Sequence, residues 1–213
     1  MFISKKNLIA IGALSAVALV IVAFIATNLI RGHRKTVEDS RVASLVADAT
    51  AELRKALGAG PSGASVAKLD ALAQSAKTSP NPAAGSAAEA YLIGAREIAR
   101  RRGESERLER EATAARNALA GHMGRSGNRD GAWIRDAAEL KRRVEATHAE
   151  LGRSLKTLDE LLNGLPDAEK RLAPHVAGTA LAEAGEIEAA RTRAQNDSKR
   201  AAAELEKVRR LTP

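Results

Sequence analysis

The chain has 213 residues, a formal net charge of +8, only 2% aromatic residues and no cysteine. The absence of cysteine excludes disulfides and thiolate metal sites. Alanine, leucine, arginine and glutamate dominate, and no strand-like alternation of β-branched residues follows the apolar N-terminal segment, so we expect an all-α protein. After that segment the sequence has only two aromatic residues, Tyr91 and Trp133, which is few for a globular core and typical of long helices.

The first predicted element is a transmembrane helix over residues 8–30. No charged residue lies between Leu8 and Ile30, and as a helix this run would be roughly 34 Å long, enough to cross a bilayer. A cleavable signal peptide is the alternative, because residues 16–18 have the form Ala-x-Ala, but largely apolar residues continue beyond them. We therefore expect a retained anchor, with a short basic tail at 1–7 and a basic collar, RGHRK, at 31–35.

The basic residues on the two sides of this segment bear on its orientation. Lys5 and Lys6 precede it, and Arg31, Arg34 and Lys35 follow it, so the counts are close. A short basic tail before a long apolar run is typical of an anchor that exports the C-terminal remainder of the chain. We expect a single-pass protein of the bacterial inner membrane whose C-terminal domain is periplasmic; the alternative is a cytoplasmic domain whose collar contacts anionic lipid.

Two short helices are predicted over residues 36–78, separated by the sequence GAGPSG at 58–63. Each has an apolar face at helical spacing. The first face consists of Val42, Val46, Ala49, Leu53 and Ala56, and the second of Val66, Leu69, Ala73 and Ala76.

A long, partly solvent-exposed helix is predicted over 87–122, with Ser86 and Glu89 as a capping box at its start. Its middle, RRRGESERLERE, has only Leu108 as an apolar residue, so we expect this part to be buried on no face and Leu108→Ala to leave stability unchanged. Acidic residues flank its arginines at helical spacing, which favours ion pairs on the helix surface and argues against nucleic-acid binding. The expected pairs join Arg100 to Glu104, Arg102 to Glu106, Glu106 to Arg110 and Arg107 to Glu111.

Residues 132–210 are predicted to form an antiparallel helical hairpin, and we expect this hairpin to be the most stable unit of the chain. Asp130 is the predicted N-cap, and Gly164 with Pro166 is expected to end the first helix. The second helix is predicted from about Ala177 to Arg210. The first helix carries a heptad-like apolar stripe, or coiled-coil seam, of Trp133, Ala137, Leu140, Val144, Thr147, Leu151, Leu155, Leu158, Leu162 and Leu165, and the second carries one of Ala194, Ser198, Ala201, Leu205 and Val208.

No catalytic, cofactor-binding or metal-binding residue is predicted. The sequence GAGPSGAS at 58–65 has the glycine spacing of a phosphate-binding loop, but Ala64 replaces the required lysine, which favours an interhelical turn. Glu145 and His148 have a di-iron spacing without a second pair, and we expect both on a solvated flank. The four histidines, His33, His122, His148 and His175, lie in different segments with no pair at metal-binding spacing, which argues against a zinc site. Trp133 is interpreted as a packing anchor at the end of the hairpin, with a binding role as the alternative. We expect Glu183, Glu186 and Glu188 on the solvated face of the last helix.

These patterns together predict a single N-terminal transmembrane helix followed by an elongated helical hairpin or bundle with coiled-coil seams. The expected function is a membrane-anchored, non-enzymatic scaffold or tether of the bacterial cell envelope, acting on a protein partner or a second copy through its seams. A ligand-sensing external bundle that signals through a partner is a second hypothesis. A membrane-bound cytoplasmic rod is the third.

Overall fold

The computed structural model of the chain describes residues 27–28, 36–58, 63, 65–125 and 130–210. The chain divides into two units, Met1–Arg41 and Val42–Pro213. In the first unit, residues 27–28 and 36–41 are helical, and the rest of the predicted anchor at 8–30, the tail at 1–7 and the collar at 31–35 lie outside the described residues. No helix among the described residues combines the length and the hydropathy that a membrane crossing requires.

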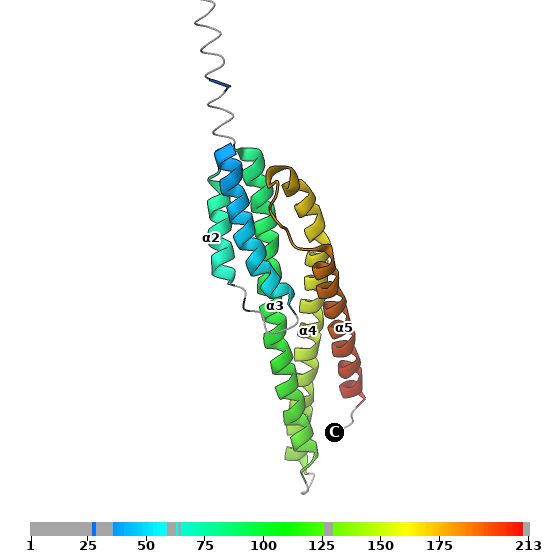
Figure 1. The fold of residues 1–213 in the computed structure, drawn as a ribbon. Helices are drawn as coiled ribbons and strands as arrows, with labels where there is room; N and C mark the ends of the chain where they lie inside the picture. Colours follow the sequence, from blue (N-terminus) through cyan, green and yellow to red (C-terminus); the bar gives the residue numbers. More distant parts are fainter. Residues whose placement is uncertain (1–26, 29–35, 59–62, 64, 126–129, 211–213) are drawn as a thin grey trace, which may run out of the picture. The chain divides into compact units, whose positions relative to one another are not determined.

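Five α-helices pack as a bundle in the described residues, which confirms the all-α prediction (Figure 1). The first is helical over residues 36–57, and only its part from Val42 onward belongs to the second unit. The others are α2 (Val66–Lys77), α3 (Pro82–Met123), α4 (Gly131–Leu172) and α5 (Ala184–Arg209), with a short 3-10 turn, η1 (Ala173–His175), after α4. Helix α3 packs against α2 and α4, and α4 packs against α5.

Side-chain caps fix where the helices begin. The Asp130 carboxylate accepts hydrogen bonds from the backbone N–H groups of Ala132 (3.1 Å) and Trp133 (2.9 Å), which confirms the predicted N-cap of α4. Helix α3 begins earlier than predicted, because Asn81 caps it and Pro82 occupies its first turn, where a missing N–H has no cost. The predicted capping box of Ser86 and Glu89 is therefore wrong, since both residues lie inside α3.

Helix α4 continues through Gly164 and Pro166 to Leu172, so the prediction that these two residues end the helix is wrong. A proline inside a helix costs about 3 kcal/mol. The turns around it contribute Leu165 and Leu172 to the core, where they are 2% and 0% exposed, and this burial offsets the cost. Helix α5 begins at Ala184 rather than near Ala177, after an extended connection.

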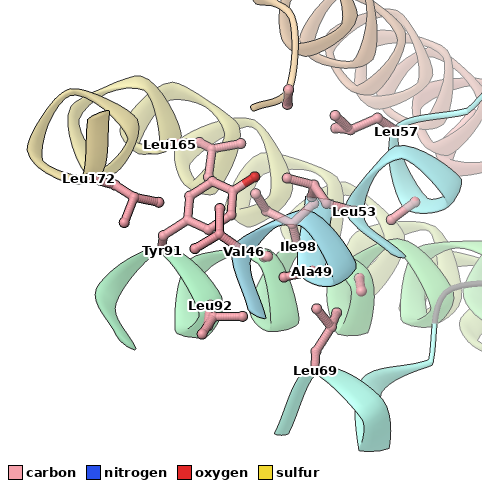
Figure 2. Packing of buried hydrophobic residues seen from close by; sticks show 14 of the residues in the cluster. Val46, Ala49, Leu53, Leu57, Leu69, Tyr91, Leu92, Ile98, Leu165 and Leu172 are labelled. Carbon is pink, nitrogen blue, oxygen red and sulfur yellow. The ribbon is translucent and has the colours of Figure 1, made fainter. Parts of the chain in front are cut away.

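The largest hydrophobic cluster joins all five helices and surrounds Tyr91 (Figure 2). The predicted apolar face of the 42–57 helix is confirmed, because all five of its residues are buried there. The Tyr91 hydroxyl shares a hydrogen bond of 2.9 Å with the Thr50 hydroxyl, and burial raises the pKa of Tyr91 to about 12. The single tyrosine of the chain thus fills the centre of a core otherwise built from aliphatic side chains.

Two smaller clusters occupy the rest of the unit. One contains Leu108, Ala112, Leu151, Leu155 and Ala201, and the other contains Ala115, Leu119, Val144 and Val208. The expectation that the middle of α3 is buried on no face is wrong, because Leu108 is 2% exposed. Its charged neighbours pair along the helix, the largely covered Arg102 with Glu106 (3.1 Å) and the exposed Arg107 with Glu111 (2.6 Å). One narrow apolar face of α3 therefore remains for α4 and α5.

Candidate functional site

Two surface depressions lie beside helix α5, on either side of its contact with α4. We call the first the α3–α5 hollow; its volume is about 270 Å³, and residues of α3, α4 and α5 line it. We call the second the α4–α5 groove; its volume is about 480 Å³, and only α4 and α5 line it. These two depressions are the candidate binding surfaces of the described residues.

The α3–α5 hollow has an apolar floor formed by Ala112, Leu151, Leu155 and Ala201. Arg200 and Arg116 carry ion pairs across it, because Arg200 of α5 contacts Glu109 of α3 at 3.0 Å and Arg116 of α3 contacts Glu204 of α5 at 3.5 Å. These ion pairs are partly exposed and contribute little to stability. They do place charges of both signs around an apolar floor.

His148 of α4 lines both depressions and is 6% exposed. The expected solvated flank is therefore wrong for His148, while Glu145 is half-buried. The Nδ1 atom of His148 lies 2.9 Å from the backbone oxygen of Val144. Because a carbonyl oxygen only accepts, Nδ1 carries a proton in this contact, and in the neutral ring Nε2 is the acceptor.

The α4–α5 groove has a floor of small and apolar residues. Helix α4 contributes Ala149, Gly152 and Leu155, and helix α5 contributes Ser198, Ala202 and Leu205. Arg153 and Lys156 of α4 and Lys199 of α5 also line the groove. The predicted seam of α5 is thus divided, since Ala194, Ala201 and Val208 are buried in the bundle while Ser198 and Leu205 line the groove.

Glu52 is a buried carboxylate at the junction between the 42–57 helix and α2. It is 4% exposed and accepts hydrogen bonds from Lys55 (3.0 Å), Lys68 (3.1 Å) and the backbone N–H of Ser65 (3.2 Å). The Lys55 ammonium, the Ser65 N–H and the Lys68 ammonium together lower the pKa of Glu52 from 4.5 to about 2. Glu52 was not predicted as a site residue, because it lies next to the predicted apolar face and only its contacts in the fold distinguish it.

The phosphate-loop pattern at 58–65 falls largely on residues 59–62 and 64, which lie outside the described residues. At its end, the Ser65 hydroxyl accepts a hydrogen bond of 3.2 Å from the Lys68 N–H as the N-cap of α2. The geometry around Ser65 is that of a helix start tied to Glu52.

The aromatic residue Trp133 packs at the turn between α3 and α4. Its ring stacks on His122 with the ring centroids 5.0 Å apart, and His122 Nε2 lies 3.0 Å from the Trp133 backbone oxygen. His175 lies in η1, and His33 is outside the described residues. Among the residues that the structure describes, no group of three or more histidine, aspartate or glutamate residues is arranged to hold a metal ion.

The acidic residues at the start of α5 have a structural role. The Glu186 carboxylate accepts a hydrogen bond of 3.0 Å from the Glu183 N–H and pairs with Arg54 at 3.3 Å, while Glu188 is exposed. The Glu183 N–H and the Arg54 guanidinium lower the pKa of Glu186. These contacts form a capping box and link α5 to the 42–57 helix.

The fold and these surfaces define an all-α helical bundle with two depressions beside its last helix. Comparison of the chain with protein-family models, with curated proteins and with solved structures found no match.

Proposed function

We propose that this chain is a membrane-anchored, non-enzymatic helical scaffold or tether of the bacterial cell envelope. In this proposal residues 8–30 cross the inner membrane, the helical unit lies in the periplasm, and helix surfaces hold a protein partner. The observation that carries the proposal is the uncharged apolar run from Leu8 to Ile30 ahead of an all-α unit.

The dimensions of the helices support this role. Helices α3 and α4 have 42 residues each. Each is therefore about 63 Å long at 1.5 Å per residue, and each presents a long surface at which another helix could pack. The faces that carry ion pairs stay in contact with water. A partner protein would therefore bind at the apolar surface that remains.

Membrane fractionation tests the proposal. We expect the full chain to stay in the membrane fraction through high salt and alkaline carbonate and to be released by detergent, whereas a shortened chain that begins at Thr36 should be found in the soluble fraction. If sequencing of the mature protein located its N-terminus at or beyond Thr27, the apolar run would be a cleaved signal peptide and the anchor would be refuted.

Protease treatment of spheroplasts tests the orientation. Cleavage of a C-terminal epitope tag in intact spheroplasts supports the periplasmic placement. Protection of the tag until the membrane is permeabilised would reverse it and favour the rod whose RGHRK collar at 31–35 contacts anionic lipid.

The α3–α5 hollow favours a second candidate function, a ligand-sensing bundle that signals through a partner. Its apolar floor, its arginine and glutamate side chains and the Nε2 atom of the buried His148 suit a small zwitterionic ligand with an apolar part. Native mass spectrometry of the full chain, purified from its own membranes, tests this function. A small molecule that is bound to the wild type and absent from His148→Ala would support the sensor, and an unliganded wild type would oppose it.

A further inference from the structure

The α4–α5 groove is an apolar surface within a strongly charged bundle. Its floor residues on α4 extend from His148 to Asp159, which is roughly 15 Å or about three helical turns. The small side chains of Ala149, Gly152 and Ala202 leave the two helix backbones accessible there. A Cβ atom added at Gly152 would meet nothing within 4 Å, so the space above this residue is open.

The groove fits a helix better than an extended chain. The backbone N–H and C=O groups of α4 and α5 bond within their own helices, so an extended peptide would find no partners for its own backbone groups over an apolar floor. A helix satisfies these groups internally and can place side chains three and four positions apart into the groove. An open space beside small residues is the usual geometry for such close helix packing.

The charges at the groove are positive. Among the described residues, Arg153 and Lys199 have no ion-pair partner, and they lie on opposite helices. Lys156 meets Glu160 only at 3.9 Å, with both side chains mostly exposed. The one carboxylate in the lining, Asp159, already binds Arg191 at 3.1 Å and Gln195 at 3.0 Å. An occupant with negative charges on its flanks would therefore meet unpaired cations on both sides.

A second copy of this chain does not fit these charges when docked groove to groove. A two-fold symmetric contact would bring Arg153, Lys156 and Lys199 of one copy against the same three residues of the other. Like charges placed together at an interface are strongly unfavourable. The charge pattern therefore favours a different, acidic partner.

We propose that the α4–α5 groove is the docking site for an amphipathic helix of a partner protein, with leucine-like side chains on one face and glutamate or aspartate residues flanking that face. The inference rests on the proposed scaffold function and names its partner class.

The absence of native cysteine allows a site-specific test on the full chain in nanodiscs of neutral phosphatidylcholine. Ala203→Cys, an exposed position of α5 beside the groove floor, carries an environment-sensitive dye, which we call the groove dye. Ala146→Cys, an exposed position of α4 outside the groove, carries the same dye as a control. Three designed helical peptides are titrated. The first has leucines on one face and glutamates beside it, the second has lysines in place of the glutamates, and the third has serines in place of the leucines.

We expect the glutamate–leucine peptide to shift the emission of the groove dye to shorter wavelength and to leave the control dye unchanged. The lysine peptide should bind at least about tenfold more weakly, because it meets like charges. The serine peptide should give no response, because it has no apolar face. Equal binding of the acidic and basic peptides, or no response of the groove dye to the acidic peptide, would overturn the proposal.

Two variants locate the binding within the groove. A Cβ atom at Gly152 meets nothing within 4 Å, so we expect Gly152→Leu to place its side chain in the open space and to abolish the dye response with an unchanged or higher melting temperature. The double variant Arg153→Glu, Lys199→Glu should reverse the peptide preference, whereas Arg143→Glu, on an exposed part of α4 outside the groove, should preserve it. Unchanged binding by Gly152→Leu would place the peptide elsewhere and refute the site.

Vesicles of anionic phosphatidylglycerol separate a lipid occupant from a protein one. A dye response to these vesicles with none to the peptide would assign the groove to lipid and overturn the proposal that a partner helix binds there.

The failure of this inference is distinguishable from the failure of the proposed function. If the chain binds the peptide but is found in the soluble fraction, the anchor alone is refuted. A membrane-anchored chain with an unresponsive groove refutes the docking site alone.

Discussion

The contacts of Glu52 depend on the charge of its carboxylate. Its carboxylate holds Lys55 of its own helix, Lys68 of α2 and the backbone of Ser65, so one buried side chain joins two helices and the start of the second. Protonation would remove the charge that these three donors stabilise. The junction between the 42–57 helix and α2 should therefore respond to acid.

We predict that Glu52→Gln lowers the free energy of unfolding at pH 7 by about 1 to 3 kcal/mol, because buried donors lose their charged acceptor. The pKa of Glu52 in the folded chain, about 2, lies below its ordinary value of 4.5. Its stabilising effect is therefore complete above pH 4.5 and is lost as the pH falls from 4.5 to about 2. Chemical denaturation of the wild type and the variant across this range measures the difference between them.

The exposed pair Lys170 and Asp167 provides the control for this experiment. Their side chains are 78% and 70% exposed, so Asp167→Asn should change stability little. The Glu52 prediction fails if the difference between Glu52→Gln and the wild type stays constant from pH 7 to pH 2.

At the scale of single helices, most apolar faces and the N-cap of α4 at Asp130 could be predicted from the sequence, whereas the start of α3, the end of α4 and the start of α5 could not. Val42, Val46 and Leu53 are buried together because helix geometry alone brings residues at this spacing to one side of the helix. This holds for any element that packs against that side. Pro166 predicts a helix end by its local sequence, but α4 continues through it. The burial of Leu165 and Leu172 is a tertiary effect that outweighs the local cost of the proline. The groove was also unpredictable, since it depends on how α5 packs against α4.

The middle of α3 is a second case in which packing overrides local composition, and it changes the expected result of a mutation. Leu108 is 2% exposed and contacts a small cluster beside α4 and α5. We predict that Leu108→Ala lowers the free energy of unfolding by about 2 to 3 kcal/mol, at the lower end for buried leucines because its cluster is small. Leu158→Ala, in the largest cluster, should cost about 3 to 5 kcal/mol.

Chemical denaturation of the full chain in detergent measures both values. Ile134→Ala is the matched control, because Ile134 is 47% exposed on α4 and its truncation should cost less than about 0.5 kcal/mol. If Leu108→Ala behaved like Ile134→Ala, the packing of this part of α3 against its neighbours would be contradicted.

At the scale of the whole helical unit, the buried residues are unevenly distributed. The largest cluster draws on all five helices around Tyr91, whereas only α3, α4 and α5 contribute to the two smaller ones. The sequence alone predicts that the hairpin of α4 and α5 is the most stable unit. The burial pattern favours the part of the bundle to which the 42–57 helix and α2 also contribute.

Hydrogen exchange of the backbone amides measures this distribution directly. We predict the slowest exchange in the segments of α3 and α4 that pack around Tyr91 and Leu165, because those amides should exchange only on global unfolding. The amides near Leu119 and Val144 should exchange faster through local opening, since their cluster has few members.

Two truncations sharpen this hydrogen-exchange test. Leu119→Ala should speed exchange only in the part of the bundle near the α3–α4 turn, whereas Leu165→Ala should speed it throughout the unit, because it lowers the global free energy of unfolding. Uniform protection along α3, or a global effect of Leu119→Ala, would show that the helical unit opens as a single cooperative whole.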